Sequence, residues 1–173
     1  MSISGILFYV ARAMALALPL TLFVYGLRKL VCRPAADAGR ERLVFLFILY
    51  AAALFAITAI RGGKHLTDFW RIPHTGDSIQ LIPLLETWKQ RRGGLWYLVY
   101  PVAGNILWFL PMGFFLRKLK PHIRWHHAAA MALAVSLGIE VLQWVLISGI
   151  SDIDDVIFNV LGGIVGYGLA KRL

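Results

Sequence analysis

Long apolar stretches with few charges recur along this chain and indicate its architecture. A helix needs about 20 mostly apolar residues to cross a bilayer, and a run of about 18 or more is a candidate. Five stretches approach or exceed this length, the last being the shortest, and they cover residues 3–27, 43–60, 95–116, 128–147 and 155–170. The pattern predicts an all-α integral membrane protein with five transmembrane helices, folded as a single membrane domain over residues 1–173.

The connection between the second and third stretches, residues 61–94, is too long for a simple turn. It mixes large apolar with charged residues, and its Trp70 and Trp88 suit the headgroup level of a membrane. We therefore expect a long amphipathic outer loop with one or two interfacial helices that do not span the membrane, and the sequence leaves open whether part of it is re-entrant. Such a loop can cover the bundle structurally, or it can act as a lid or lipid entrance.

The placement of basic residues predicts an orientation. Short connections rich in Lys and Arg stay in the cytoplasm. Residues 28–42 hold five Lys or Arg, residues 117–127 hold four and the C-terminal tail holds two, whereas the other side has six, all in residues 61–94. The N-terminus is therefore expected outside and the C-terminus in the cytoplasm.

The formal net charge of +9 comes from the same basic residues beside the apolar stretches. Hydrophobic residues make up 59% of the chain, and the basic ones cluster beside the ends of the apolar stretches, where they can meet anionic lipid headgroups. No basic module with interleaved aromatic residues accompanies them. Membrane lipids are the expected partners, and nucleic acid is not.

The last two apolar stretches each carry polar residues on one helical face. At 100° per residue, the stripe on the last stretch is made by Asp152, Asp155, Asn159, Gly162, Gly163 and Gly166. The stripe on the stretch before it is made by Ser136, Glu140, Gln143 and Ile147. Glycines let helices approach closely, so polar residues beside them point into a helix interface. The short connection 148–155 makes the two helices antiparallel neighbours, and we expect the stripes to face one another.

Three polar residues on different helices are expected to lie at similar depths below the outer membrane surface. At 1.5 Å per residue, Glu140, Asn105 and Arg12 lie about 11, 15 and 14 Å from the outer ends of their stretches. The sequence therefore predicts a buried polar pocket that opens outward. The candidate ligand-binding residues are Asn105, Gln143, Asn159 and Arg12, and the candidate catalytic residues are Glu140, Asp152 and Asp155.

Two interpretations of this pocket remain open. Ionisable groups inside a membrane are costly and mark functional sites by default. Alternatively, Arg12 neutralises Glu140, and the amides tie helices together through bonds of about 0.6–2 kcal/mol each. Asp154 falls on another side of its helix, where capping of the helix N-terminus is the expected role.

The same residues resemble the VanZ-like family of bacterial membrane proteins. The similarity lies in "SIQLIPL", "GNILWFLPMGFFL", "EVLQW" and "DIDDVIFNVLGGIVGY", within about residues 78–168. The matching family positions are Asn105, Pro111, Gly113, Glu140, Gln143, Asp152, Asp155, Asn159 and Gly162. Pro111, Gly113, Gly162 and Gly166 are expected to be structural. Gly149 stands where the family often has an arginine, and Arg12 is a hypothetical replacement for it.

The resemblance implies a multi-pass protein of the bacterial plasma membrane, in a family whose founding member is associated with resistance to teicoplanin, a lipid-tailed glycopeptide. One function is to bind amphiphiles, such as lipids, lipoglycopeptides or lipid-linked envelope intermediates. A second is enzymatic action on a lipid headgroup, with Glu140, Asp152 and Asp155 serving as acid and base or holding a divalent cation. A third is a scaffold that binds another helix, or a second copy, through Gly162 and Gly166.

Overall fold

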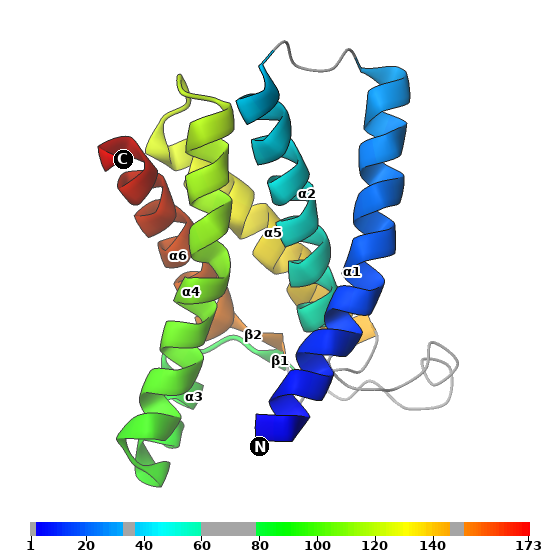
Figure 1. Ribbon diagram of the computed structural model, residues 1–173. Helices are drawn as coiled ribbons and strands as arrows, with labels where there is room; N and C mark the ends of the chain where they lie inside the picture. Colours follow the sequence, from blue (N-terminus) through cyan, green and yellow to red (C-terminus); the bar gives the residue numbers. More distant parts are fainter. Residues whose placement is uncertain (1–2, 33–36, 60–78, 146–150) are drawn as a thin grey trace. The chain divides into compact units, whose positions relative to one another are not determined.

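The computed structural model describes residues 3–32, 37–59, 79–145 and 151–173. In chain order the elements are α1 (Ile3–Val31), α2 (Ala38–Ala59), β1 (Ile79–Gln80), α3 (Leu85–Gln90), the short 3-10 helix η3 (Arg91–Gly93), α4 (Leu95–Leu119), α5 (Trp125–Val145), β2 (Ser151–Asp152) and α6 (Ile153–Arg172) (Figure 1). The all-helical architecture is confirmed. The chain forms two compact units, Met1–Arg61 and Gly62–Leu173, and a single membrane domain over the whole chain stays a prediction.

The first unit is a hairpin of α1 and α2, two long helices that the apolar stretches predicted. Arg28 donates to both carboxylate oxygens of Glu41 at 2.9 Å, and the Tyr25 hydroxyl donates to the same carboxylate. At the start of α2, the backbone N–H groups of Arg40 and Gly39 donate to Asp37 and lower the pKa of its carboxyl. Charge-assisted bonds therefore hold this end of the hairpin.

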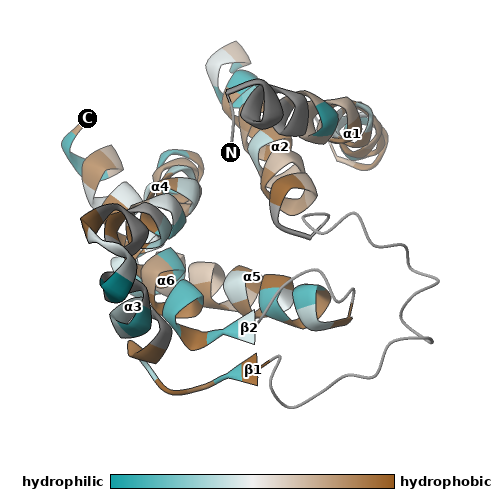
Figure 2. Ribbon diagram, turned by 90° about the horizontal axis from the view of Figure 1, so that it is seen from below, coloured by the Kyte–Doolittle hydropathy of each residue, from teal (hydrophilic) through white to brown (hydrophobic). Residues whose placement is uncertain are grey.

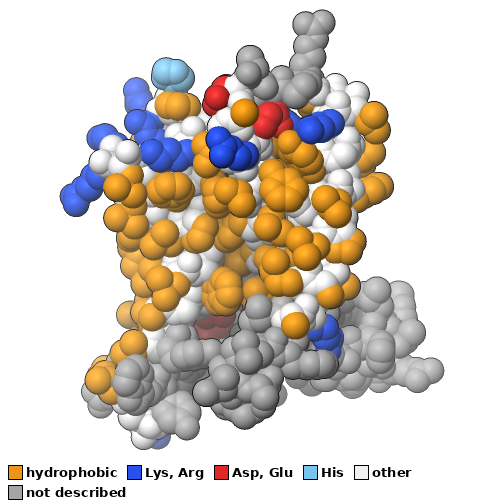
Figure 3. Space-filling view, in the orientation of Figure 1, with side chains coloured by type: hydrophobic (Ala, Val, Ile, Leu, Met, Phe, Trp, Pro, Cys, Tyr) orange, Lys and Arg blue, Asp and Glu red, His pale blue; other side chains and the backbone are white. Residues whose placement is uncertain are grey.

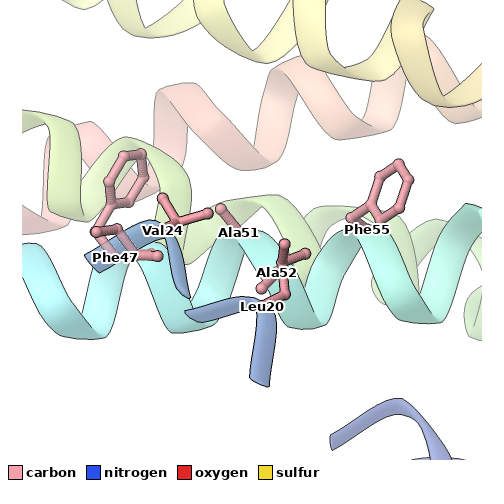
Figure 4. Close-up of a pocket in the computed structure, with 7 residues that line it drawn as sticks. Leu20, Val24, Phe47, Ala51, Ala52 and Phe55 are labelled. Atoms are coloured by element: carbon pink, nitrogen blue, oxygen red, sulfur yellow. The ribbon is translucent and has the colours of Figure 1, made fainter. Parts of the chain in front are cut away.

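An apolar hollow of about 280 Å³ lies between α1 and α2. Figure 4 shows it in close-up, and its lining residues are Leu20, Val24, Phe47, Ile48, Ala51, Ala52 and Phe55. These side chains carry no acid, base or amide, so this hollow is not the polar pocket that the sequence predicts. Arg12 belongs to α1 in this unit, and its predicted role beside Glu140 stays a prediction.

The second unit is built around α6, which packs on both α4 and α5. A side chain at Gly162 would collide with the backbone carbonyl of Ile106, and one at Gly166 with that of Leu110. A side chain at Gly113 would likewise collide with the carbonyl of Gly163. The glycines therefore bring the backbones of α4 and α6 into direct contact.

This packing agrees only in part with the expected one, in which the stripes of α5 and α6 face one another: Gly163 meets Ala132 of α5 and Asn159 bonds to Ser136 of α5. The short α5–α6 connection does make those helices neighbours, yet Gly162 and Gly166 contact α4. A second copy or another protein could bind this face only by displacing α4. Pro111 lies inside α4 near the same contact.

The exposed and buried faces of α6 are reversed relative to a soluble helix. Its exposed large residues are Ile157, Leu161, Val165 and Leu169, and its buried residues are Asp154, Val156, Asn159, Gly162, Gly163, Gly166 and Ala170. Apolar side chains cover much of the visible helical surface (Figure 3). An apolar exterior around a polar and small-residue interior is what a lipid environment favours.

Three helices within the described residues are long and apolar enough to cross a membrane: α5, α6 and the segment Ala11–Val31 of α1. Together with the reversed faces of α6, they indicate a membrane protein. At one end of the second unit, the Tyr167 hydroxyl donates to the carbonyl of Ile123, and Arg117 stacks over the Tyr167 ring. The basic α4–α5 connection and the basic end of α6 therefore lie together.

A small parallel strand pair closes the opposite end of this unit. Ile79 of β1 pairs with Ser151 of β2, and Gln80 pairs with Asp152. Figure 2 shows β1 beside β2, with hydrophilic positions at the start of α6. The predicted outer loop falls partly on residues 60–78, which lie outside the described residues. Its later part forms β1, α3 and η3, and the interfacial position of this part stays a prediction.

Candidate polar site in the second unit

Glu140 links α5 to the segment that leads into α6. Its side chain is only 8% exposed, and its Oε2 accepts a hydrogen bond of 3.0 Å from the backbone N–H of Asp152. The Glu140 carbonyl accepts a second bond from the Ser151 hydroxyl at 2.9 Å. The carboxyl groups of Asp155 and Asp152 lie close enough to that of Glu140 to interact with it electrostatically. Three predicted catalytic candidates are therefore neighbours in space.

A second polar contact connects α4 to α6. The Asn105 side-chain amide donates to Oδ1 of Asp155 at 2.5 Å. This bond joins residues fifty positions apart, and it places α4 beside the polar residues of α5 and α6. The expectation that Asn105 approaches the acids at the start of the last helix is met by the geometry.

The deepest polar contact joins α5 to α6. Asn159 is 5% exposed, and its Nδ2 donates to the hydroxyl of the fully buried Ser136 at 2.9 Å. Ser136 lies one helical turn below Glu140, and Asn159 lies one turn below Asp155. The Asn159 Oδ1 atom is buried and has no hydrogen-bond partner. Such an atom is costly when it stays unsatisfied, so it needs an explanation.

Gln143 and Gln80 complete the polar cluster. Gln143 is buried on the face of α5 that carries Glu140. Gln80 is opposite Asp152 in the strand pair, and paired residues of a parallel ladder project to the same side. The Gln80 Nε2 atom is buried without a partner. We use "polar cluster" for the set Gln80, Asn105, Ser136, Glu140, Gln143, Asp152, Asp155 and Asn159.

Asp152 and Asp154 cap two different helices. Asp152 caps α6, because its side chain accepts from the N–H of Asp154 at 2.9 Å. Asp154 is 2% exposed and reaches another segment, where it accepts from the backbone N–H of Leu84. It also accepts from the N–H of Thr87 at 3.2 Å and from the Thr87 hydroxyl at 2.6 Å. The prediction that Asp154 caps its own helix is therefore wrong, since it caps the first turn of α3.

The predicted site residues do not include Gln80, Asp154 or Ser136. Gln80 and the role of Asp154 depend on β1 pairing with β2, and a two-residue strand leaves no periodic signal in the sequence. Ser136 was placed on the polar stripe but not among the site residues. Ile147 and Gly149 lie outside the described residues.

The hypothesis that Glu140, Asp152 and Asp155 hold a divalent cation stays a prediction. No three His, Cys, Asp or Glu side chains within it are arranged to hold a metal ion. Asp152 and Glu140 both have oxygens that accept backbone N–H bonds.

Sequence comparison identifies the family of this chain. The sequence profile of the VanZ/LLP1 family matches residues 47–173, which include the whole polar cluster. This chain belongs to the VanZ/LLP1 family. The VanZ/LLP1 match also extends further toward the N-terminus than the motifs at 78–168, because it begins within α2.

One similar protein is Protein VanZ of Enterococcus faecium, which is 35% identical over 71 residues. These residues make up 39% of this chain and 44% of that protein, so the chain matches less than half of the relative's length. No solved structure matches the chain.

Proposed function

We propose that this VanZ/LLP1 protein binds amphiphilic molecules, lipids or lipoglycopeptides, through the polar cluster, which opens toward the outer side of the bacterial plasma membrane. One observation carries the proposal. Asn159 is buried among apolar helices, one turn below the carboxylates, and within the described residues its amide oxygen has no hydrogen-bond partner. A bound polar group would supply the missing hydrogen bond and offset the cost of that atom.

The proposed topology has five spans, with the N-terminus outside and the C-terminus in the cytoplasm. At 1.5 Å per residue, α2 and α4 are about 33 and 37 Å long, which is enough to cross the hydrocarbon core. The α4–α5 connection and the end of α6 form one basic end, which the positive-inside rule assigns to the cytoplasm. The polar cluster lies near the other end of α6 and therefore faces the outer leaflet.

Structural reinforcement alone explains the cluster poorly. Interhelical hydrogen bonds in membranes contribute about 0.6–2 kcal/mol each. A charged side chain at the centre of a membrane-spanning helix costs about 2.5–3.5 kcal/mol on insertion scales, which is an upper bound for this cluster nearer the outer end. Glu140 accepts one described backbone bond but faces two further acids. A cluster that only tied helices together would be better built from neutral side chains.

The surroundings of the cluster suit a lipid tail. The exposed faces of α5 and α6 are apolar, with Leu137 and Val141 on α5 and Ile157 and Leu161 on α6. Segment 79–90 also exposes large apolar side chains, including Trp88, which is 60% exposed. A headgroup in the cluster would place its acyl chains along these surfaces, as expected for an amphiphile in the outer leaflet.

Glu140→Gln is expected to abolish the retention of amphiphiles during purification. The amide keeps the shape and an oxygen that can accept from Asp152, but it removes the charge. Native mass spectrometry of protein extracted in mild detergent should show bound lipid on the wild type and about tenfold less on the variant. Asp37→Asn, which removes an exposed carboxylate in the first unit, is the matched control. Equal retention by Glu140→Gln and wild type would refute binding through the cluster.

Expression of the wild-type chain in a teicoplanin-susceptible bacterium is expected to raise the minimal inhibitory concentration of teicoplanin. Teicoplanin has a polar body and a lipid tail, which are the two parts that the cluster and its apolar surroundings would accept. Glu140→Gln, expressed to the same level, should give no increase. An increase that persists in Glu140→Gln would separate any effect on this drug from the polar cluster.

A further inference from the structure

We propose that the first unit binds an anionic phospholipid of the cytoplasmic leaflet, with one acyl chain in the apolar hollow between α1 and α2 and the headgroup at the basic end of this hairpin. The site is separate from the polar cluster, and it takes from the proposed function only the orientation of the chain. The shape of the hollow, the charge of residues 28–42 and the distance between the two support it.

The hollow is a short groove with a low floor. Ala51 and Ala52 lie along α2 between Phe47 and Phe55, whose rings stand at its two ends (Figure 4). Phe47 and Phe55 are eight residues apart, so the groove is about 12 Å long. Its volume is about 280 Å³, and a helix about 10–12 Å across would need roughly three times as much over the same length. The groove therefore suits a flexible hydrocarbon chain better than another helix.

The apolar lining can position an acyl chain but cannot select a lipid. Leu20, Val24 and Phe55 are 42%, 39% and 43% exposed, so a chain in the groove can reach them. Lipid tails are as apolar as these side chains, so exchanging one tail for another brings no hydrophobic gain. A chain in the groove gains only packing contacts. Selectivity must therefore come from the headgroup.

The segment that joins α1 to α2 is strongly basic. Residues 28–42 hold five Lys or Arg against two acids, Asp37 and Glu41, which gives this segment a net charge of +3. Arg28 forms an ion pair with Glu41 at 2.9 Å, so this carboxylate does not oppose an anionic headgroup alone. Basic sites between membrane helices on the cytoplasmic side bind anionic headgroups. The charge of this end therefore favours a negatively charged lipid.

Lys29 directs a positive charge toward the interface of the two helices. Its ammonium nitrogen lies 4.9 Å from the centroid of the Tyr25 ring, and the Tyr25 hydroxyl donates to Glu41 of α2. An ammonium group has three N–H donors, so one above a ring keeps donors for other acceptors. A phosphate group at the basic end of the hairpin can therefore accept from Lys29.

The distance between the charges and the groove matches the headgroup layer of a bilayer. Lys29 comes five residues after Val24 on α1, and Arg42 comes five residues before Phe47 on α2, which is about 7.5 Å along each helix. A bilayer is about 40–45 Å thick with its headgroups and about 30 Å without them, so each headgroup layer is about 5–7.5 Å thick. The groove then covers most of the roughly 15 Å of hydrocarbon in one leaflet. Both helices therefore place charge and groove at the depths that one phospholipid occupies.

Photolabelling tests the location of this lipid. The open groove lets the lipid exchange in detergent, so the site is probed with added lipid. A phosphatidylglycerol with a diazirine midway along one acyl chain is titrated into the purified full chain, and the labelled peptides are mapped. Labelling should concentrate on residues 20–24 and 47–55. Equal labelling of the exposed apolar faces of α5 and α6 would overturn the proposal, because lipid would then cover every apolar surface alike.

Two double variants test the charge. Lys29→Gln/Arg42→Gln should lower the apparent affinity for the phosphatidylglycerol probe at least about tenfold, because each basic residue near a membrane surface contributes about fivefold. Lys171→Gln/Arg172→Gln removes the same charge from the second unit and should change the affinity less than about twofold. Equal losses in the two double variants would overturn the basic end of the hairpin as the headgroup site.

Ala51→Phe tests the groove. Ala51 is exposed, so the new ring would fill the groove without entering the core, and the basic residues would stay in place. The affinity for the probe should fall about tenfold, and the circular dichroism spectrum should match that of wild type. Ala130→Phe makes the same change at an exposed position of α5 and should bind as wild type does. Unchanged labelling of the hairpin in Ala51→Phe would overturn the groove as the place of the acyl chain.

The hairpin and the polar cluster can be measured separately. All six tryptophans lie in the second unit, so thermal unfolding followed by tryptophan fluorescence reports on that unit, whereas labelling of α1 and α2 reports on the hairpin. Glu140→Gln should leave the labelling of the hairpin unchanged. If the wild-type hairpin is not labelled, or if a phosphatidylcholine with the same chains labels it equally well, the inference of an anionic lipid fails while the proposed function of the polar cluster stands.

Discussion

Replacing Gly166 by alanine is expected to lower the free energy of unfolding by about 1–3 kcal/mol or more, because the new methyl group would force α4 away from α6. The added carbon would overlap the backbone carbonyl of Leu110. Backbone atoms cannot rotate away as the end of a flexible side chain can, so the two helices must separate. Reversible unfolding in mixed detergent, followed by circular dichroism, measures the change.

Gly168→Ala is the matched control for this prediction. Gly168 lies two residues further along α6, and a side chain there would meet no atom within 4 Å. Alanine is the better helix former by about 0.5–1 kcal/mol, so this variant should be as stable as wild type or slightly more stable. Equal stability of Gly166→Ala and Gly168→Ala would show that α4 and α6 do not touch at this glycine.

Asp154→Ala is expected to release segment 84–90 from the start of α6 at a cost on the order of 3 kcal/mol. The Asp154 carboxylate accepts from the backbone N–H of Leu84 and from both donors of Thr87. Hydrogen bonds to a charged group are stronger than neutral ones, and this group is almost fully buried. Amide hydrogen exchange in segment 84–90 should rise sharply, while exchange in α4 should change little.

Thr87→Val separates the contribution of the Thr87 hydroxyl from the total contribution of the Asp154 carboxylate. This variant loses the hydroxyl bond to Asp154 but keeps the backbone bond, so its effect should be well under half that of Asp154→Ala. Unchanged exchange in segment 84–90 after Asp154→Ala would contradict the proposed link between α3 and α6.

The helices could be predicted from the sequence because an apolar run must be long enough to cross the hydrocarbon core of a bilayer. The predicted stretch 128–147 corresponds to α5 at Trp125–Val145, and 155–170 corresponds to α6 at Ile153–Arg172. The polar face of α5 was also predictable, since Ser136, Glu140 and Gln143 recur at helical spacing and are all buried. Both predictions depend only on local periodicity.

The partners of those faces could not be predicted in the same way. Connection length correctly indicated that α5 and α6 are neighbours, but it gave no information on α4, whose backbone meets the glycines of α6. The bond from Asn105 to Asp155 and those from Asp154 to segment 84–87 join residues far apart in the chain. Such contacts depend on packing, and a single sequence records no pairing of distant residues.

The unsatisfied atoms are the least predictable feature and the most informative one. The sequence shows that Asn159 lies on a polar face, but not that its amide nitrogen bonds to Ser136 while its oxygen remains without a partner. A buried polar atom kept at a cost to stability is typical of a functional site. On this observation we base the proposal that the polar cluster binds a ligand.

The most direct test of this account compares stability with binding in the double variant Ser136→Ala/Asn159→Leu. The double variant removes both partners of the buried bond and the unsatisfied oxygen together, and such replacements are close to neutral or stabilising. We predict a thermal unfolding midpoint equal to or above that of wild type, together with loss of the increase that bacterial lipid extract gives the wild-type protein. A clearly lower midpoint with an undiminished response to lipid would contradict the account, because the cluster would then hold the helices together and bind nothing.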